Sequence, residues 1–265
     1  MSRLGRYEYT LKQLVKSFIS NTKPIAVFRE NALKLVVGTH PNTNPLHHQW
    51  AMNRLLISFA KKQLNEIPKG ASVLDVGVGS GPYWDLRPDL NWQGLDITDG
   101  ERVDYLITGD LPWPIETKIF DVVLCTQVIE HVEDPDFLVS EIERVLKSGG
   151  RVILNAPFLY PFHGMPDDQM RYTTTKLTRL FKEFDVLQCG VLGGVGSSLA
   201  TIILNFLNYK VSQSLFLQIV RLFLFPVWLV FNAICNLLLV SFDKIDNTDS
   251  FPLNTYLIAI SRQKP

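Results

Sequence analysis

The sequence predicts an α/β protein built on a doubly wound, largely parallel β-sheet with helices on both faces. The first observation is that short apolar runs alternate with helical patterns from residue 72 onward, an order typical of parallel sheets. The second is a loop with glycine at every second position, residues 77–81, directly after the first of these runs. The third is an apolar content of 46% in 265 residues, which supports a sizeable core.

Residues 1–67, ahead of this pattern, are expected to form a helical cap on a single main domain at residues 68–265. Apolar side chains recur there at helical spacing in two groups. They are Leu11, Leu14, Val15 and Phe18, and then Leu55, Leu56, Phe59 and Leu64. The stretch 40–45 between them has the composition of a loop.

The main domain contains seven segments that we expect to be strands. They lie near residues 72–76, 92–96, 103–107, 119–125, 150–156, 184–190 and 254–261. After the fourth, Asp134 suits the N-cap of a helix, Pro135 suits its first position, and Gly149 is expected to end it. Before the last strand, an insertion at about 192–245 contains an apolar segment, 215–242, that we expect to be helical.

The glycine loop favours a nucleoside without a phosphate group. Gly77, Gly79 and Gly81 follow Asp75 at the end of the first strand, and glycine lets the backbone approach a ligand closely. The dinucleotide fingerprint requires a third glycine or an alanine where this chain has Pro82. A carboxylate at the position of Asp75 repels a pyrophosphate and attracts an ammonium group. These departures favour S-adenosylmethionine over a dinucleotide.

Two further acids stand where such a nucleoside would bind. Asp96 ends the second strand, at the position that bonds the ribose hydroxyls in doubly wound folds; a helix cap or solvated loop acid is the alternative. Asp110 follows the third strand and is placed to accept a hydrogen bond from an adenine amino group, with Leu111 packing on the ring. The alternative for that stretch is a proline-rich turn.

Taken in order, these motifs resemble the class I S-adenosylmethionine-dependent methyltransferases, in particular the group called type 11. The resemblance covers roughly residues 70–190. It is carried by Val73 to Gly81, Asp96, Asp110–Leu111, Phe120–Val123, Val128–Pro135 and Leu146–Gly150. It implies a Rossmann-like seven-stranded sheet whose last strand runs antiparallel between the fifth and the sixth.

The resemblance also implies a place for each part of the cofactor. Asp75 and the three loop glycines would surround the methionine moiety, Asp96 and Ile97 would meet the ribose, and Asp110 and Leu111 the adenine. Residues Thr126 to Val128 would lie under the sulfonium. Val78 departs from the family, which more often has a small or polar residue there.

Methyl transfer from a sulfonium requires mostly alignment and exclusion of water, and a general base matters for a hydroxyl or a protonated amine. His131, after the fourth strand, is one candidate base; alternatively it braces the strand-to-helix loop. His163 and Asp168 are candidates in the long loop after the fifth strand, where an ion pair of Asp168 with Arg171 is the alternative. Arg171 and Tyr172 are predicted to contact the substrate. The His, Pro, acid and Arg-Tyr-Thr pattern of this loop resembles methyltransferases associated with cell-surface glycan assembly.

Composition argues against several other functions. With 26 basic and 26 acidic residues there is no electrostatic case for nucleic-acid binding. Cys125, Cys189 and Cys235 form neither a disulfide framework nor a metal spacing, and no metal site is predicted. The first residues lack the apolar core of a signal peptide, so we expect a cytoplasmic protein.

Residues Leu222 to Phe242 form a run of 21 without a charge, long enough to cross a bilayer. The strands before and after this insertion should be neighbours in one sheet, so the chain between them must cross the membrane an even number of times. The other apolar stretch of the insertion, 199–207, is too short to make the second crossing. Pro226 would also kink the helix, and Asn232 and Asn236 would lack partners in lipid. We therefore expect peripheral contact with a membrane interface through residues 215–242; the alternative is a helix buried in the core or in a dimer interface.

The sequence thus predicts an S-adenosylmethionine-dependent methyltransferase acting on a small-molecule, sugar or lipid-linked acceptor. Two alternatives remain open at this point. One is an NAD-dependent oxidoreductase of the same general fold, which Pro82 and Asp75 disfavour. The other is a cofactor-binding, membrane-associated protein without catalysis.

Overall fold

The computed structural model describes residues 44–108, 111–163, 167–246 and 248–262. The first group of helical-pattern residues, Leu11 to Phe18, and Asp110 lie outside this range. The second group lies in helix α2 (Trp50–Leu64), as expected.

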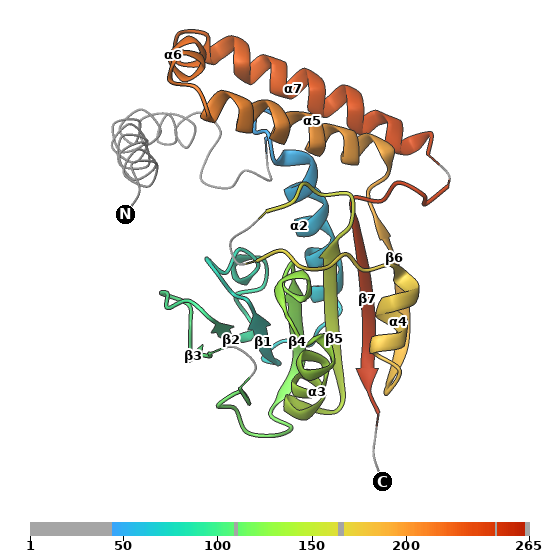
Figure 1. Cartoon of the computed structure of the whole chain (residues 1–265). Helices are drawn as coiled ribbons and strands as arrows, with labels where there is room; N and C mark the ends of the chain where they lie inside the picture. The colour runs from blue at the N-terminus through green and yellow to red at the C-terminus, as the bar shows by residue number, and fades with distance from the viewer. Residues whose placement is uncertain (1–43, 109–110, 164–166, 247, 263–265) are drawn as a thin grey trace, which may run out of the picture.

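The seven predicted strands form one sheet with the order β3-β2-β1-β4-β5-β7-β6 (Figure 1). Strands β1 to β5 pair in parallel, whereas β7 runs antiparallel between β5 and β6, which confirms the predicted fold class. The strand bounds are β1 Ser72–Val76, β2 Asn91–Asp96, β3 Tyr105–Leu106, β4 Phe120–Thr126, β5 Leu146–Pro157, β6 Phe184–Leu192 and β7 Asn254–Ser261.

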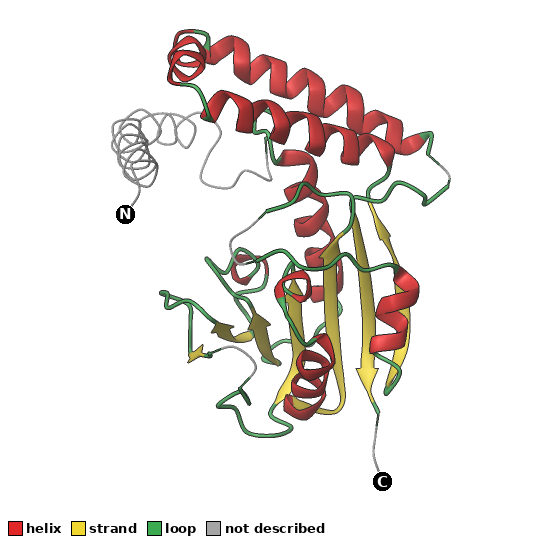
Figure 2. Ribbon diagram, viewed as in Figure 1, coloured by secondary structure: helices red, strands yellow, loops and turns green. Residues whose placement is uncertain are grey.

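Helices cover both faces of the sheet (Figure 2). On one face α2 packs Phe59 and Leu64 against strand residues that include Val73 and Ile258. On the other face α3 (Pro135–Val145) and α4 (Thr174–Leu180) bury Ile142 and other apolar side chains in the larger core cluster. The apolar runs are therefore buried on both sides, as parallel strands require.

Helix α3 begins as predicted and ends earlier than predicted. Asp134 Oδ1 accepts from the amides of Asp136 and Phe137, both at 3.0 Å, and Pro135 follows the cap. The helix ends at Val145 rather than near Gly149, because Leu146 is already extended and pairs with Phe120 in the sheet. The strand-forming Leu146 therefore overrides the helical pattern.

The apolar insertion forms a separate helical layer of α5 (Val195–Ser212), α6 (Leu215–Phe223) and α7 (Phe225–Ser241). Pro226 lies in the first turn of α7, where proline fits, so the expected kink does not occur. The amides of Asn232 and Asn236 donate to the carbonyls of Leu46 and Pro45 at 3.0 and 2.7 Å. The layer lies beyond the end of the sheet toward which β5 runs (Figure 1).

Candidate functional site

A cleft of about 670 Å³ opens at the carboxyl ends of β1, β2 and β4. This is where doubly wound folds bind ligands, and the volume is typical of a small-molecule site. Six residues predicted for the site line it: Gly77, Asp96, Ile97, Gln127, Val128 and His131. The other lining residues were not predicted from the sequence: Val76, Leu95, Thr98, Ile107, Thr108, Trp113, Val132, Glu133, Phe137, Leu138 and Gln169.

The glycine loop and Asp96 are joined directly. Asp96 Oδ2 accepts from the amide of Gly79 at 2.9 Å, and its Oδ1 accepts from the amide of Thr98 at 3.0 Å. Gly77 has φ +68°, and a Cβ there would lie 2.3 Å from Val128 Cγ2. Only a glycine therefore lets the end of β1 come this close to the turn after β4.

Not every predicted cofactor residue lines the cleft. Thr126 is buried, and its hydroxyl bonds the Tyr83 side chain. Gly79, Gly81 and Leu111 lie outside the lining, and Leu111 is 62% exposed.

Asp75 also lies outside the lining, in the core beneath the loop. Its carboxyl is 1% exposed and accepts from the indole Nε1 of Trp84 at 3.0 Å. Burial raises the pKa of Asp75 to about 8, although the Trp84 hydrogen bond acts in the opposite direction. Burial therefore favours the protonated form of Asp75 near neutral pH and weakens the negative charge that was expected to attract an ammonium group.

Replacing Asp75 with asparagine should stabilise the protein more at pH 8 than at pH 5. The unfolded chain ionises near pH ~4 and the folded protein only near 8, so the wild type loses stability as pH rises between these values. Asparagine has no proton to lose and can still accept from Trp84. The melting-temperature gain should grow with pH, by about 2–4 °C for each kcal/mol. Asp99→Asn, at an exposed loop position, is the control, and a gain that does not vary with pH would contradict the prediction.

Two lining residues are held by contacts that the sequence does not reveal. Gln127 adopts a positive φ of 56°, and its amide donates to Asn155 Oδ1 at 2.7 Å and Asn254 Oδ1 at 3.1 Å. It thereby ties the ends of β4, β5 and β7 together. Trp113 donates its backbone N–H to Glu141 Oε2 of α3 at 2.7 Å, which fixes the loop under the cleft.

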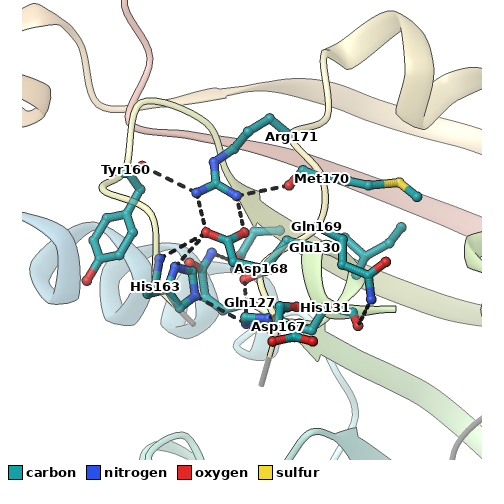
Figure 3. Close-up of polar contacts among 12 residues, drawn as sticks. Gln127, Glu130, His131, Tyr160, His163, Asp167, Asp168, Gln169, Met170 and Arg171 are labelled. Carbon is teal, nitrogen blue, oxygen red and sulfur yellow. Dashed lines mark hydrogen bonds and ion pairs between the residues drawn. The ribbon is translucent and has the colours of Figure 1, made fainter. Parts of the chain in front are cut away.

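The two candidate histidines lie against each other (Figure 3), and His131 is among the residues that line the cleft. Their Nε2 atoms lie 3.2 Å apart, and His131 Nε2 lies 3.6 Å from Glu130 Oε1. Glu130 is fully buried, which raises its pKa to about 8. Desolvation lowers the pKa of His163. Glu130 was not predicted from the sequence, and its position next to His131 was the signal that could have found it. It is the only one of these three side chains that is fully buried.

Asp168 forms an ion pair with Arg171, which was the alternative to a role as base. The guanidinium contacts both carboxylate oxygens, with Nη2 at 2.7 Å from Oδ2 (Figure 3), and holds the pKa of Asp168 at about 2. Arg171 also donates to the carbonyls of Tyr160 and Met170. Both side chains therefore pin the loop, and neither Asp168 nor Arg171 is among the residues that line the described cleft.

Tyr172, the other residue predicted to contact the substrate, is buried and also lies outside the lining of the cleft. Its side chain is 1% exposed, and its hydroxyl donates to the carbonyl of Ile129 at 3.2 Å. Burial raises the pKa of Tyr172 to about 12. Tyr172 is therefore part of the core and is not among the residues that line the described cleft.

Comparison with known proteins agrees with this architecture. Residues 74–154 match the Methyltransf_11 family model, described as a methyltransferase domain. The chain is 31% identical to the ubiquinone biosynthesis O-methyltransferase of Xanthomonas axonopodis pv. citri over 127 residues, 42% of this chain and 51% of the relative. It is 29% identical to phosphoethanolamine N-methyltransferase 2 of Caenorhabditis elegans over 110 residues, 35% and 25% of the two chains. The chain thus spans about half the length of the first of these relatives.

Solved structures share the fold. Phosphoethanolamine N-methyltransferase 2 of Haemonchus contortus, solved with S-adenosyl-L-methionine, has a TM-score of 0.51 and 17% identity, covering 88% of this chain and 60% of its own. The [4+2]-cyclase SpnF has a TM-score of 0.51 and 16% identity, covering 80% and 82%. Residues 74–154 are thus similar to a methyltransferase domain, and the chain shares its fold with these solved structures.

Proposed function

We propose that this chain transfers a methyl group from S-adenosylmethionine to a small, lipid-linked acceptor. The observation that carries the cofactor assignment is the glycine loop held to Asp96 at the mouth of a cleft of suitable size. In the reaction a lone pair on the acceptor attacks the methyl carbon, and the carbon–sulfur bond breaks. Its electron pair stays on sulfur, which leaves neutral S-adenosylhomocysteine. The proton of a hydroxyl acceptor passes to a base or to water.

Apart from the buried Asp75 and Thr126, the cofactor residues keep in this proposal the roles that the resemblance gave them. The loop glycines would flank the methionine moiety, Asp96 and Ile97 the ribose, Asp110 and Leu111 the adenine. The exposure of Ile97 and Leu111, 54% and 62%, is consistent with apolar side chains that a bound ring would cover. Gln127 and Val128, which line the cleft, would lie under the sulfonium.

Asp96→Ala should weaken S-adenosylmethionine binding by about 1–3 kcal/mol, because a charged hydrogen-bond partner of the ribose is lost. Calorimetric titration with S-adenosylmethionine, and separately with NAD, measures this and tests the cofactor assignment. Asp99→Asn on the following loop is the control. An unchanged dissociation constant in Asp96→Ala would remove Asp96 from the site, and preferential binding of NAD would overturn the proposal.

The oxidoreductase alternative has one sequence feature in its favour. Tyr172 and Lys176 stand at the Tyr-x-x-x-Lys spacing of a catalytic pair in such enzymes. However, the Tyr172 hydroxyl is buried and bonded to Ile129, so it does not face the cleft. The other alternative is a protein that binds the cofactor without catalysis. A screen for transfer of labelled methyl groups to lipid extracts distinguishes such a protein from an enzyme.

The lipid-linked acceptor is supported by the apolar outer surface of the helical layer. In α7 a stripe of side chains at helical spacing is more than half exposed. These are Val227 62%, Val230 55%, Ile234 57%, Leu237 55% and Leu238 59%. Phe216 and Phe223 of α6 are 71% and 81% exposed. Apolar surface of this extent favours a membrane interface.

The helix Phe225–Lys244 is long and apolar enough to cross a membrane by length and composition, with a mean hydropathy of 1.9. Its packing against α5, and the two asparagine bonds to residues 45–46, favour a peripheral position instead. The layer lies toward the end of the sheet at which the cleft opens (Figure 1). A protein resting on a membrane by this layer would have its cleft near the surface, at the inner face if it is cytoplasmic.

Val230→Glu combined with Leu237→Glu should release the protein from vesicles. Two carboxylates on the outer stripe cannot enter the acyl boundary without a large desolvation cost. Flotation with vesicles of phosphatidylcholine and phosphatidylglycerol measures the bound fraction. Leu187→Glu, at a 50% exposed position on β6, is the matched control and should float like the wild type. If the wild type itself remains unbound, the membrane part of the proposal is wrong.

A further inference from the structure

The neighbours of His131 and His163 favour the tautomer of each neutral ring that carries its proton on Nδ1. His131 Nδ1 lies 3.1 Å from the carbonyl oxygen of Asp167, an acceptor only. His163 Nδ1 lies 3.0 Å from Asp168 Oδ2, off the line of a regular hydrogen bond. A bare nitrogen in either place would face a negatively polarised oxygen. The Nε2 atoms that approach to 3.2 Å therefore both carry lone pairs when the rings are neutral.

Glu130 adds a third electron-rich group at the same point. Its side chain is fully buried, and neither oxygen has a donor from another residue within the described part of the chain. Burying a carboxylate without a partner is costly. Two imidazole nitrogens and an unpartnered carboxyl oxygen therefore converge within 4.8 Å of one another, an arrangement that a proton or a metal ion between them would stabilise.

We propose that Glu130, His131 and His163 bind one divalent transition-metal ion of the zinc class. Two ligands at about 2.0–2.1 Å from a tetrahedral ion lie about 3.3 Å apart, close to the 3.2 Å between the two Nε2 atoms. One carboxylate and two imidazoles form a ligand set that zinc accepts in sites with an open fourth position.

The surroundings of the ligands suit a metal. Ligating histidines usually place the other ring nitrogen against a carboxylate or a backbone carbonyl, which orients the ring. Asp168, which Arg171 holds in place, would orient the ring of His163 through Nδ1. The backbone carbonyl of Asp167 would orient the ring of His131 in the same way. The ion pair between Asp168 and Arg171 would thus hold the loop and also orient a metal ligand. Sequence spacing could not predict the site, because His163 comes from a different loop.

The open position would face the cleft that His131 lines. This role of the metal rests on the proposed function. The metal would lower the pKa of an acceptor hydroxyl bound to it, and the hydroxyl would release its proton to water. Its oxygen would then attack the methyl carbon of the cofactor. The metal would thereby replace a general base.

The test is cobalt binding to the untagged full-length protein after dialysis against a chelator. Co²⁺ in a four-coordinate site has visible absorption bands, and Zn²⁺ should displace it at one equivalent. Glu130→Gln and His163→Ala should abolish the bands, and Asp168→Asn should weaken binding about 10–100-fold. His47→Asn, a histidine change on the segment before α2, should bind like the wild type.

Equal cobalt binding by the wild type and His163→Ala, or no binding by either, would overturn the proposal, and the two Nε2 atoms would then share a proton. His163 is 34% exposed, so its replacement should not prevent folding. Neither cofactor nor acceptor is needed for this measurement. Its failure is therefore distinguishable from failure of the proposed methyl transfer, which the cofactor titration tests separately.

Discussion

Replacing Gly79 with valine should abolish S-adenosylmethionine binding and leave the protein folded. Gly79 has φ +50°, and a Cβ built on it meets no described atom within 4 Å. The valine side chain would therefore enter the open space beside the loop, where we place the methionine moiety, rather than collide with the protein. Its β-branched side chain also disfavours the positive φ. Calorimetric titration of the purified variant measures the loss.

Gly70→Val separates this blockage from simple backbone strain. Gly70 precedes β1, has φ +73°, and likewise offers open space to a Cβ among the described atoms. Both variants should lose stability on the order of 1–2 kcal/mol from the left-handed conformation. Only Gly79→Val should lose the cofactor. Undiminished binding by Gly79→Val would mean that the loop does not hold the methionine moiety.

The sheet was predictable because its signals are local. Each strand is a short apolar run, and burial on both faces leaves little room for another interpretation. Where local preference and tertiary pairing disagree, the prediction was wrong: Leu146 continues the apolar stripe of α3 and yet pairs with Phe120. Pro226 was expected to kink a long helix, but the chain uses it to begin a new one after α6.

The candidate site was only partly predictable, because half of it depends on contacts between distant segments. Asp96 follows from its position at a strand end. Gln127 has a positive φ, and its side chain is hydrogen-bonded to Asn155 and Asn254. No local sequence pattern predicts these hydrogen bonds. The meeting of His163 with His131 depends equally on the path of the loop after β5. Asp168 stood close to Arg171 in the sequence, so their ion pair could be anticipated as an alternative.

His131→Ala and His163→Ala should each lower turnover by about 10²–10⁴-fold with unchanged affinity for S-adenosylmethionine. That range is typical for loss of the group that handles the acceptor proton. His131 lines the cleft and His163 contacts His131, whereas the proposed cofactor contacts come from the glycine loop and Asp96. Initial rates with an acceptor found in the labelled-methyl screen, together with calorimetry, measure the two effects. His47→Asn is the control and should keep both.

The double variant His131→Ala/His163→Ala decides whether the two rings act as one unit. Groups that serve a single step are strongly non-additive, so the double variant should be about as slow as either single one. If the loss of turnover in the double variant equals the product of the two single losses, the histidines have independent roles. Near-wild-type rates in all three variants would show that alignment alone drives the transfer. A metal could then still bind at Glu130, His131 and His163, but it would have no part in the chemistry.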